Sequence, residues 1–177
     1  MAPPKSLALA ALLLAVAAAG QVPLCAGLGT SPNSSVLVSG VVPCAAGSSI
    51  NIATVPVFPN AAMQLVCGSK AVSNTTADAN GAFLFSMPGV SDKKLLNDML
   101  VRNQCKVVVV TPLAACDKSL AGATGTLTAP VKLLGIDTGS GGGGGGLISG
   151  IIGLIGGIIS GVIGGIINLG TGSFSLV

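Results

Sequence analysis

Apolar and polar residues alternate along the middle of the chain, the pattern of β-strands that bury one face. Strands are expected at residues 36–44, 50–58, 62–67, 81–87, 106–111 and 127–134. The β-branched run at 106–111 predicts a strand buried on both faces, whereas Pro130 confines the last strand to an edge or a bulge. Asn80-Gly81 is typical of a tight hairpin turn. Strands at this spacing predict one small β-barrel or sandwich over residues 27–138.

One short amphipathic helix interrupts the strands. Ser91 is a good N-cap, Asp92 follows in the first turn, and the apolar residues Leu95, Leu96, Met99 and Leu100 fall on one face. Lys93 and Lys94 lie on the other face and could contact an anionic surface. Because the acidic residues nearby leave little net charge, we interpret that face as solvated instead.

The N-terminal segment has the pattern of a secretory signal peptide. One lysine precedes an apolar stretch over residues 6–19, which is too short to span a bilayer. Cleavage after Ala26 removes Cys25 and leaves four cysteines, an even number suited to an oxidising compartment. We therefore prefer a signal peptide at 1–26, with cleavage after Gly20 as the alternative.

The C-terminal segment is apolar, rich in glycine and uncharged after Asp137. Residues 139–146 read as a glycine linker, and residues 147–177 as a hydrophobic Gly/Ile tail. We expect residues 147–170 to be largely unstructured in water, since glycine disfavours helix, and to become ordered on lipid or by self-association. The alternatives are a disordered low-complexity tail, a removed lipid-anchor signal and a transmembrane helix.

The amino-acid composition excludes several kinds of active site and binding site. The chain has no His, Trp or Tyr, and its five acidic residues are all aspartates. Without His, an imidazole-activated nucleophile and the common zinc sites are excluded. The net charge of +3 is too small for a nucleic-acid-binding surface. We expect no enzyme activity, no cofactor, no metal and no nucleic acid.

Four cysteines and two glycosylation sequons remain as candidate sites. Cys44, Cys67, Cys105 and Cys116 predict two disulfides, of which the spacing leaves three connectivities open. The sequons begin at Asn33 and Asn74 and mark surface loops of a secreted chain. Asn74, which lies between expected strands, is the better candidate.

Several segments together carry a family resemblance. They are Val38-Ser-Gly-Val-Val-Pro-Cys44, the stretch from Val57 to Cys67, Thr76-Ala-Asp-Ala-Asn-Gly-Ala-Phe83, and Cys105-Lys-Val-Val-Val-Val-Thr-Pro-Leu-Ala-Ala-Cys116. In this order they resemble the Ole e 1-like pollen-protein family, and within it the phylloplanins, a leaf-surface branch. The resemblance covers about residues 36–134. It implies a secreted plant protein with a small β-barrel or sandwich, and the disulfides Cys44–Cys116 and Cys67–Cys105.

For function, the resemblance implies defence of aerial plant surfaces by inhibition of fungal or oomycete spores. The expected location is extracellular, on the plant surface or in the cell wall. The tail adds expected partners, namely cuticle wax, lipid, a microbial surface or a second copy of the chain. The alternatives are a structural cell-wall glycoprotein, with or without a GPI anchor, and a carrier of a small ligand in the β domain.

Overall fold

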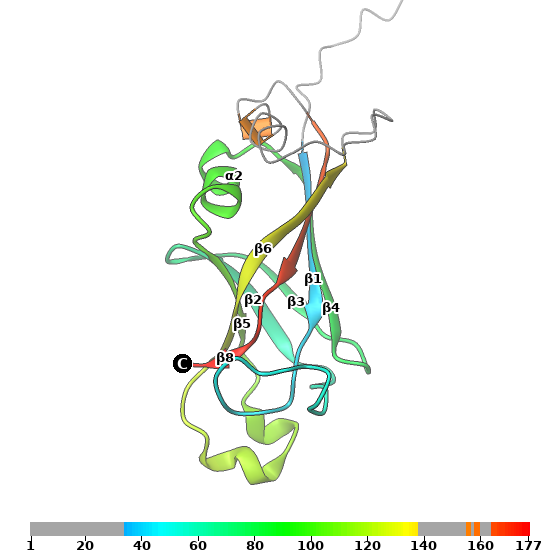
Figure 1. Cartoon of the computed structure of the whole chain (residues 1–177), viewed down its shortest axis with the longest axis vertical. Coiled ribbons are helices and arrows are strands. Elements are labelled where there is room, and N and C mark those ends of the chain that lie inside the picture. Colours follow the sequence, from blue (N-terminus) through cyan, green and yellow to red (C-terminus); the bar gives the residue numbers. More distant parts are fainter. Residues whose placement is uncertain (1–33, 138–154, 157, 160–163) are drawn as a thin grey trace, which may run out of the picture. The chain divides into compact units, whose positions relative to one another are not determined.

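Strands supplied by both the middle and the end of the chain form one sheet (Figure 1). The computed structural model describes residues 34–137, 155–156, 158–159 and 164–177. Over these residues the strands are β1 Ser34–Val41, β2 Ala62–Cys67, β3 Lys70–Thr76, β4 Ala82–Val90, β5 Cys105–Val109, β6 Leu127–Asp137, β7 Ile166–Thr171 and β8 Ser175–Leu176. Their order in the sheet is β3-β2-β5-β6-β7-β1-β4, and β8 pairs with the start of β6.

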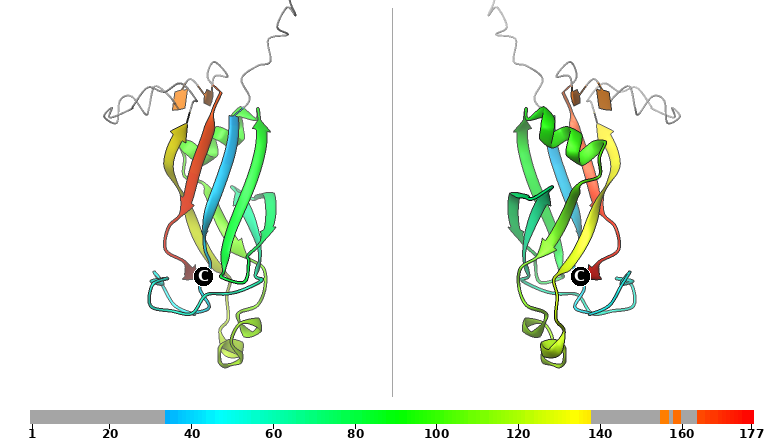
Figure 2. Two further views of the ribbon diagram at one scale, coloured as in Figure 1. Left: turned by 90° about the vertical axis from the view of Figure 1, so that its right-hand side faces the viewer. Right: turned by 90° about the vertical axis from the view of Figure 1, so that its left-hand side faces the viewer.

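The sheet curls until its two edge strands, β3 and β4, meet. The hydroxyl Oγ1 of Thr75 on β3 donates a hydrogen bond of 3.0 Å to the carbonyl of Leu84 on β4. Closing a sheet on itself removes exposed strand edges, which are otherwise sites of aggregation. The nearly closed barrel confirms the mainly β fold expected from the alternation (Figure 2).

The interior of the barrel is filled by side chains from nearly every strand. The largest fully buried residues are Phe58, Phe85, Phe174, Met63, Leu65, Ile167, Leu169, Val36, Val38, Val42, Val107 and Val131. Phe83 and Phe85 point inward from β4, and their rings meet edge to face with centroids 5.7 Å apart. The alternation seen in the sequence therefore marks the inward positions.

β7 corrects the expected boundary between the domain and the tail. The sequence analysis ended the β domain at residue 138, but β7 lies between β6 and β1 and buries Ile167 and Leu169. It is antiparallel to β6 and parallel to β1. Ile158, from the same apolar segment, is also buried against the core. Residues 166–177 thus belong to the fold, because their alternating apolar side chains complete the barrel core.

The turns explain further differences from the sequence-based expectation. β3 was not expected, and it follows β2 through the two-residue turn Gly68-Ser69, where Gly68 supplies a φ of 63°. Asn80-Gly81 does form a turn, but it joins β3 to β4, which do not pair as a hairpin. Residues 50–58, expected as a strand, form turns with isolated bridges, since the prolines interrupt the backbone pairing.

Two strands differ in burial or position from the expectation. β5 alternates rather than being buried on both faces, because Lys106 points outward and Val108 is half-buried. β6 lies inside the sheet although it contains Pro130. The carbonyl of Pro130 accepts from Gly172 N at 2.8 Å, between the stretches that pair with β7 and β8. The proline, which lacks an N–H, is tolerated at this gap between neighbours.

The helix α2 spans Lys93–Leu100 and contacts β2 and β6. Asp92, rather than Ser91, is its N-cap, and the Asp92 carboxylate accepts from the backbone N–H groups of Lys94 and Leu95. Two short 3-10 turns, η1 Leu113–Ala115 and η2 Lys118–Gly122, follow β5. The expected signal peptide at 1–26 and the glycine linker at 139–146 lie outside the described residues. Within the part that is described, no helix has the length and apolar character needed to span a bilayer.

Candidate functional site

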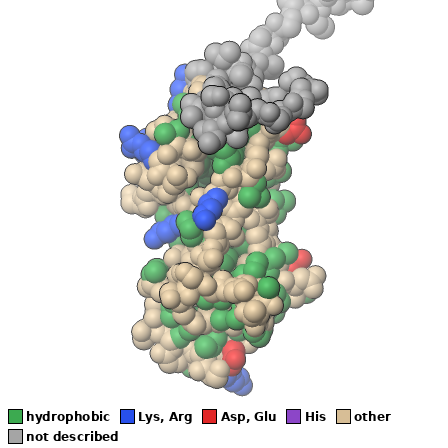
Figure 3. Space-filling model, viewed as in Figure 1, with side chains coloured by type: hydrophobic (Ala, Val, Ile, Leu, Met, Phe, Trp, Pro, Cys, Tyr) green, Lys and Arg blue, Asp and Glu red, His purple; other side chains and the backbone are tan. Residues whose placement is uncertain are grey.

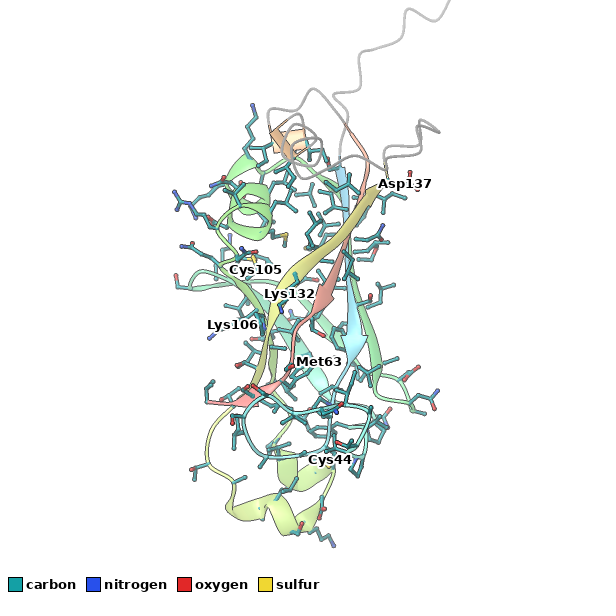
Figure 4. The ribbon with its side chains drawn as sticks, viewed as in Figure 1. Cys44, Met63, Cys105, Lys106, Lys132 and Asp137 are labelled. Carbon is teal, nitrogen blue, oxygen red and sulfur yellow. A yellow bond between two sulfur atoms is a disulfide. The ribbon has the colours of Figure 1, made fainter. Side chains whose placement is uncertain are left out.

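Two disulfides fasten the barrel at separate places. Cys67 and Cys105 are direct register partners on β2 and β5, with Cα atoms 4.1 Å apart. Cys44, after β1, is joined to Cys116 at the end of η1 across 72 residues of sequence. Figure 4 shows Cys44 near one end of the barrel and Cys105 nearer α2. These are the pairs that the family resemblance implied: Cys67–Cys105 joins two paired strands, and Cys44–Cys116 joins two segments outside the strands.

A groove of about 340 Å³ lies between α2 and the β2–β3 hairpin. Its lining combines two lysines, two aspartates and an apolar floor: Cys67, Lys70, Ala71, Val72, Asp92, Lys94, Leu95 and Asp98. Most of the Lys and Arg side chains visible in Figure 3 lie on the side of the view where α2 packs. Four charged side chains, two of each sign, therefore meet at this groove.

Asp98 is the unusual residue of this groove. Its side chain is only 5% exposed, although it is an aspartate on a short surface helix. Oδ2 accepts from Lys94 Nζ at 3.0 Å, whereas Oδ1 is buried and has no hydrogen-bond partner. Arg102 NH1 lies 3.9 Å from Oδ1, too far for a hydrogen bond. The sequence analysis missed Asp98, whose spacing of three residues from Leu95 could have placed it beside the apolar face.

The three strands on the opposite side of the barrel are uncharged, and Lys132 and Asp137 of the neighbouring β6 border them. β1, β4 and β7 contain no Lys, Arg, Asp or Glu. Their outward side chains include Leu84 at 51% and Ile166 at 43% exposure, separated by small polar residues. Leu134 of the adjacent β6 is 70% exposed and lies over Gly170. We call the outer surface of β7, β1 and β4, together with Leu134, the uncharged face (Figure 2, left).

The structure describes the sequon asparagine Asn74 but not Asn33. Asn74 is exposed, but it lies within β3 opposite Gln64 of β2, not in a loop as expected. A loop was expected at this position because the polar sequence of β3 lacks the alternation of apolar and polar residues that marks a half-buried strand. Since β3 is an edge strand with an outward Asn74, a glycan there would point away from the core, and glycosylation stays a prediction.

The described surface shows open grooves rather than an enclosed chamber. Besides the α2 groove, one of about 390 Å³ lies near Phe174 and Lys132, and one of about 400 Å³ lies across Gln64 and Asn74. Over the described residues, no three His, Cys, Asp or Glu side chains gather in a way that could hold a metal.

The comparison with protein families decides the identity. Residues 33–148 match the model of the phylloplanin antifungal proteins. The chain belongs to the phylloplanin family. The matched residues include most strands of the barrel. The link to the wider Ole e 1-like family stays a resemblance. β7 and β8 lie beyond the matched residues, although they complete the phylloplanin sheet seen here.

A curated relative supports the same assignment. The chain is 34% identical over 108 residues to phylloplanin from Nicotiana tabacum. The aligned region covers 59% of this chain and 65% of the relative, so it spans a little under two thirds of the relative's length. No solved structure matches the chain.

Proposed function

We propose that this protein is secreted onto plant surfaces, where it inhibits fungal or oomycete spores without catalysing a reaction. The observation that carries the proposal is the match of residues 33–148 to an antifungal family. The two disulfides support an extracellular location, since such bonds persist in oxidising compartments. Deposition on that surface would bring the protein into contact with spores that land and germinate there.

The uncharged face suggests how the protein is retained there. A wax or lipid surface excludes charged groups, because an ion loses its hydration on contact with hydrocarbon. β1, β4 and β7 present only apolar and small neutral side chains outward. The apolar residues 147–165, which also carry no charge, connect to this face through β7. We propose that face and segment together adsorb to cuticle wax, lipid or a microbial surface, and that the segment supports self-association.

Adsorption is tested by placing charge on the face. Ser39 and Ser86 are exposed on β1 and β4, so Ser39→Lys with Ser86→Lys adds two cations without altering the core. The control, Ser69→Lys with Thr124→Lys, adds the same charge at exposed positions outside the face. Binding to wax-coated particles should fall by about tenfold in the first variant only, since a cation resists dehydration. Equal binding by both variants would show that the face has no role.

Spore inhibition is measured separately, by germination counts of fungal and oomycete spores on wax-coated and bare glass. The parent protein should inhibit germination on both surfaces. When the coated glass is rinsed before the spores are added, inhibition on wax should fall more for the Ser39→Lys, Ser86→Lys variant than for the parent protein. If the purified parent protein leaves germination unchanged on both surfaces, spore inhibition is wrong even where adsorption is found.

A further inference from the structure

The α2 groove contains a buried hydrogen-bond acceptor that nothing in the protein satisfies. Asp98 Oδ1 is closed to solvent and has no partner, while its neighbour Oδ2 is bound to Lys94. Leaving a buried carboxylate oxygen unpaired is costly, and such atoms are rare in folded proteins. A ligand that supplies one O–H or N–H donor to Oδ1 would remove that cost.

The charges of the groove restrict what this ligand is. Lys70 and Lys94 are balanced by Asp92 and Asp98, so the lining has no net charge. Asp92 already accepts two backbone N–H groups as the cap of α2, which leaves Asp98 as the free acceptor. An anion would be repelled by the Asp98 carboxylate, and a cation would compete with Lys94 and Arg102 for it. A neutral molecule that both donates and accepts hydrogen bonds fits this balance.

We propose that the groove binds a neutral glycan. One sugar hydroxyl donates to Asp98 Oδ1, and an adjacent hydroxyl accepts from the ammonium of Lys70 or Lys94. The apolar floor of Val72, Leu95 and the Cys67–Cys105 disulfide takes the C–H face of the sugar ring. The groove volume of about 340 Å³ suits a short stretch of glycan, since pockets for small ligands begin at ~300 Å³.

Access to Oδ1 requires a small movement of the Arg102 side chain beside it. The side chains of Lys94 and Arg102 are 84% and 58% exposed. Arg102 lies 3.9 Å from Oδ1 and makes no hydrogen bond there, so its side chain can rotate away while Lys94 keeps its bond to Oδ2. The backbone of α2, tied by its cap and by the bond from Gln104 N to the Asp98 carbonyl, stays in place.

The experiment is a titration of the ¹⁵N-labelled full-length mature protein, followed by amide chemical shifts. The probes are cellotetraose, laminaritetraose and chitotetraose, each added alone, with inorganic phosphate and Ca²⁺ as charged comparisons. At least one neutral probe should shift amides at residues 68–72 and 92–98 and leave the uncharged face unmoved. This readout is independent of spore inhibition, so failure of the proposed antifungal action would leave it standing.

Variants identify the acceptor. Asp98→Asn keeps the size of the side chain but removes the charge of the acceptor, and it should weaken glycan binding about tenfold, equal to ~1.4 kcal/mol. Asp117→Asn is the matched control, because it removes one aspartate charge from the exposed cap of η2, where asparagine also caps. Lys70→Ala retains Asp98 and should also weaken binding, which covers the case in which Asp98→Asn does not fold.

Three results would overturn the proposal. The first is the absence of groove shifts with all three saccharides. The second is unchanged affinity in folded Asp98→Asn, which would make the carboxylate a purely structural partner of Lys94 and Arg102. The third is a groove response to phosphate or Ca²⁺ without any response to the neutral probes.

Discussion

Adjacent isoleucines on β7 provide a direct test of whether the end of the chain belongs to the barrel. Ile167 is fully buried and lies opposite Val36 of β1 and Ile136 of β6. Ile166 precedes it and points outward with 43% exposure. Ile167→Ala and Ile166→Ala therefore make the same chemical change on opposite faces of one strand.

The expected magnitudes follow from this difference in burial. Ile167→Ala leaves a cavity between β1 and β6 and should lower the free energy of unfolding by about 2–5 kcal/mol. Ile166→Ala loses strand propensity and partial contact, for about 0.5–1 kcal/mol. Because both variants lose a similar strand propensity, the difference between them measures the additional burial of Ile167.

Urea unfolding, with the disulfides intact, measures both values. The chain has no Trp or Tyr, so far-UV circular dichroism is the suitable probe. With a urea dependence of about 1.5 kcal/mol/M, a loss of 3 kcal/mol lowers the midpoint by about 2 M. The Ile166→Ala midpoint should fall by less than about 0.7 M on the same scale.

The refuting result is a small and equal midpoint shift in the two variants. It would mean that residues 166–171 do not contribute to the core and that the whole apolar segment is a tail, as the sequence alone suggested. A lowered urea dependence in Ile167→Ala would instead show that unfolding is no longer a single transition.

Other positions give independent tests. Gly81→Ala should destabilise the protein more than Gly68→Ala in the same urea assay: both glycines have positive φ, but only a Cβ at Gly81 would meet other atoms, within 2.8 Å. Replacing both cysteines of the 72-residue disulfide by serine should cost about 4 kcal/mol in the chain-entropy model, and an unchanged midpoint would contradict this. The backbone amide of Ser119, and then its hydroxyl, hold the pKa of Asp117 below its ordinary value. The stabilisation from Asp117 is therefore present above the unfolded-state pKa and lost as the pH falls through the folded pKa; Ser119→Ala should raise that pKa only in part, as followed by ¹³C titration of the carboxyl group.

The elements that sequence reasoning found are those in which burial follows a local pattern. β2 and β4 alternate clearly, and the helix at 93–100 shows an apolar face. β3 has the polar sequence Lys-Ala-Val-Ser-Asn-Thr-Thr, and it is a strand because β2 pairs with it across a tight turn. That pairing is a tertiary effect, and the sequence of β3 has no alternation of apolar and polar residues that would predict a strand.

The same limit applies to the candidate site. The cysteine pairs came from family resemblance, since spacing alone left three connectivities open. The burial of Asp98 depends on how α2 packs over β2 and β6, so its type and position predicted only a surface carboxylate. The lysines were placed on the solvated face of the helix, and Lys94 is indeed 84% exposed while its ammonium binds Asp98.

The place of β7 also limits how the apolar segment can associate with lipid. A helix over residues 147–170 would reach about 36 Å, enough to cross the core of a bilayer. It would have to withdraw Ile167 and Leu169 from the barrel and open the sheet between β1 and β6. Residues 147–165 alone reach about 28 Å as a helix, slightly less than the ~30 Å hydrocarbon core. Insertion of a helix over residues 147–170 therefore competes with folding of the barrel, whereas adsorption along a surface would leave β7 in the sheet.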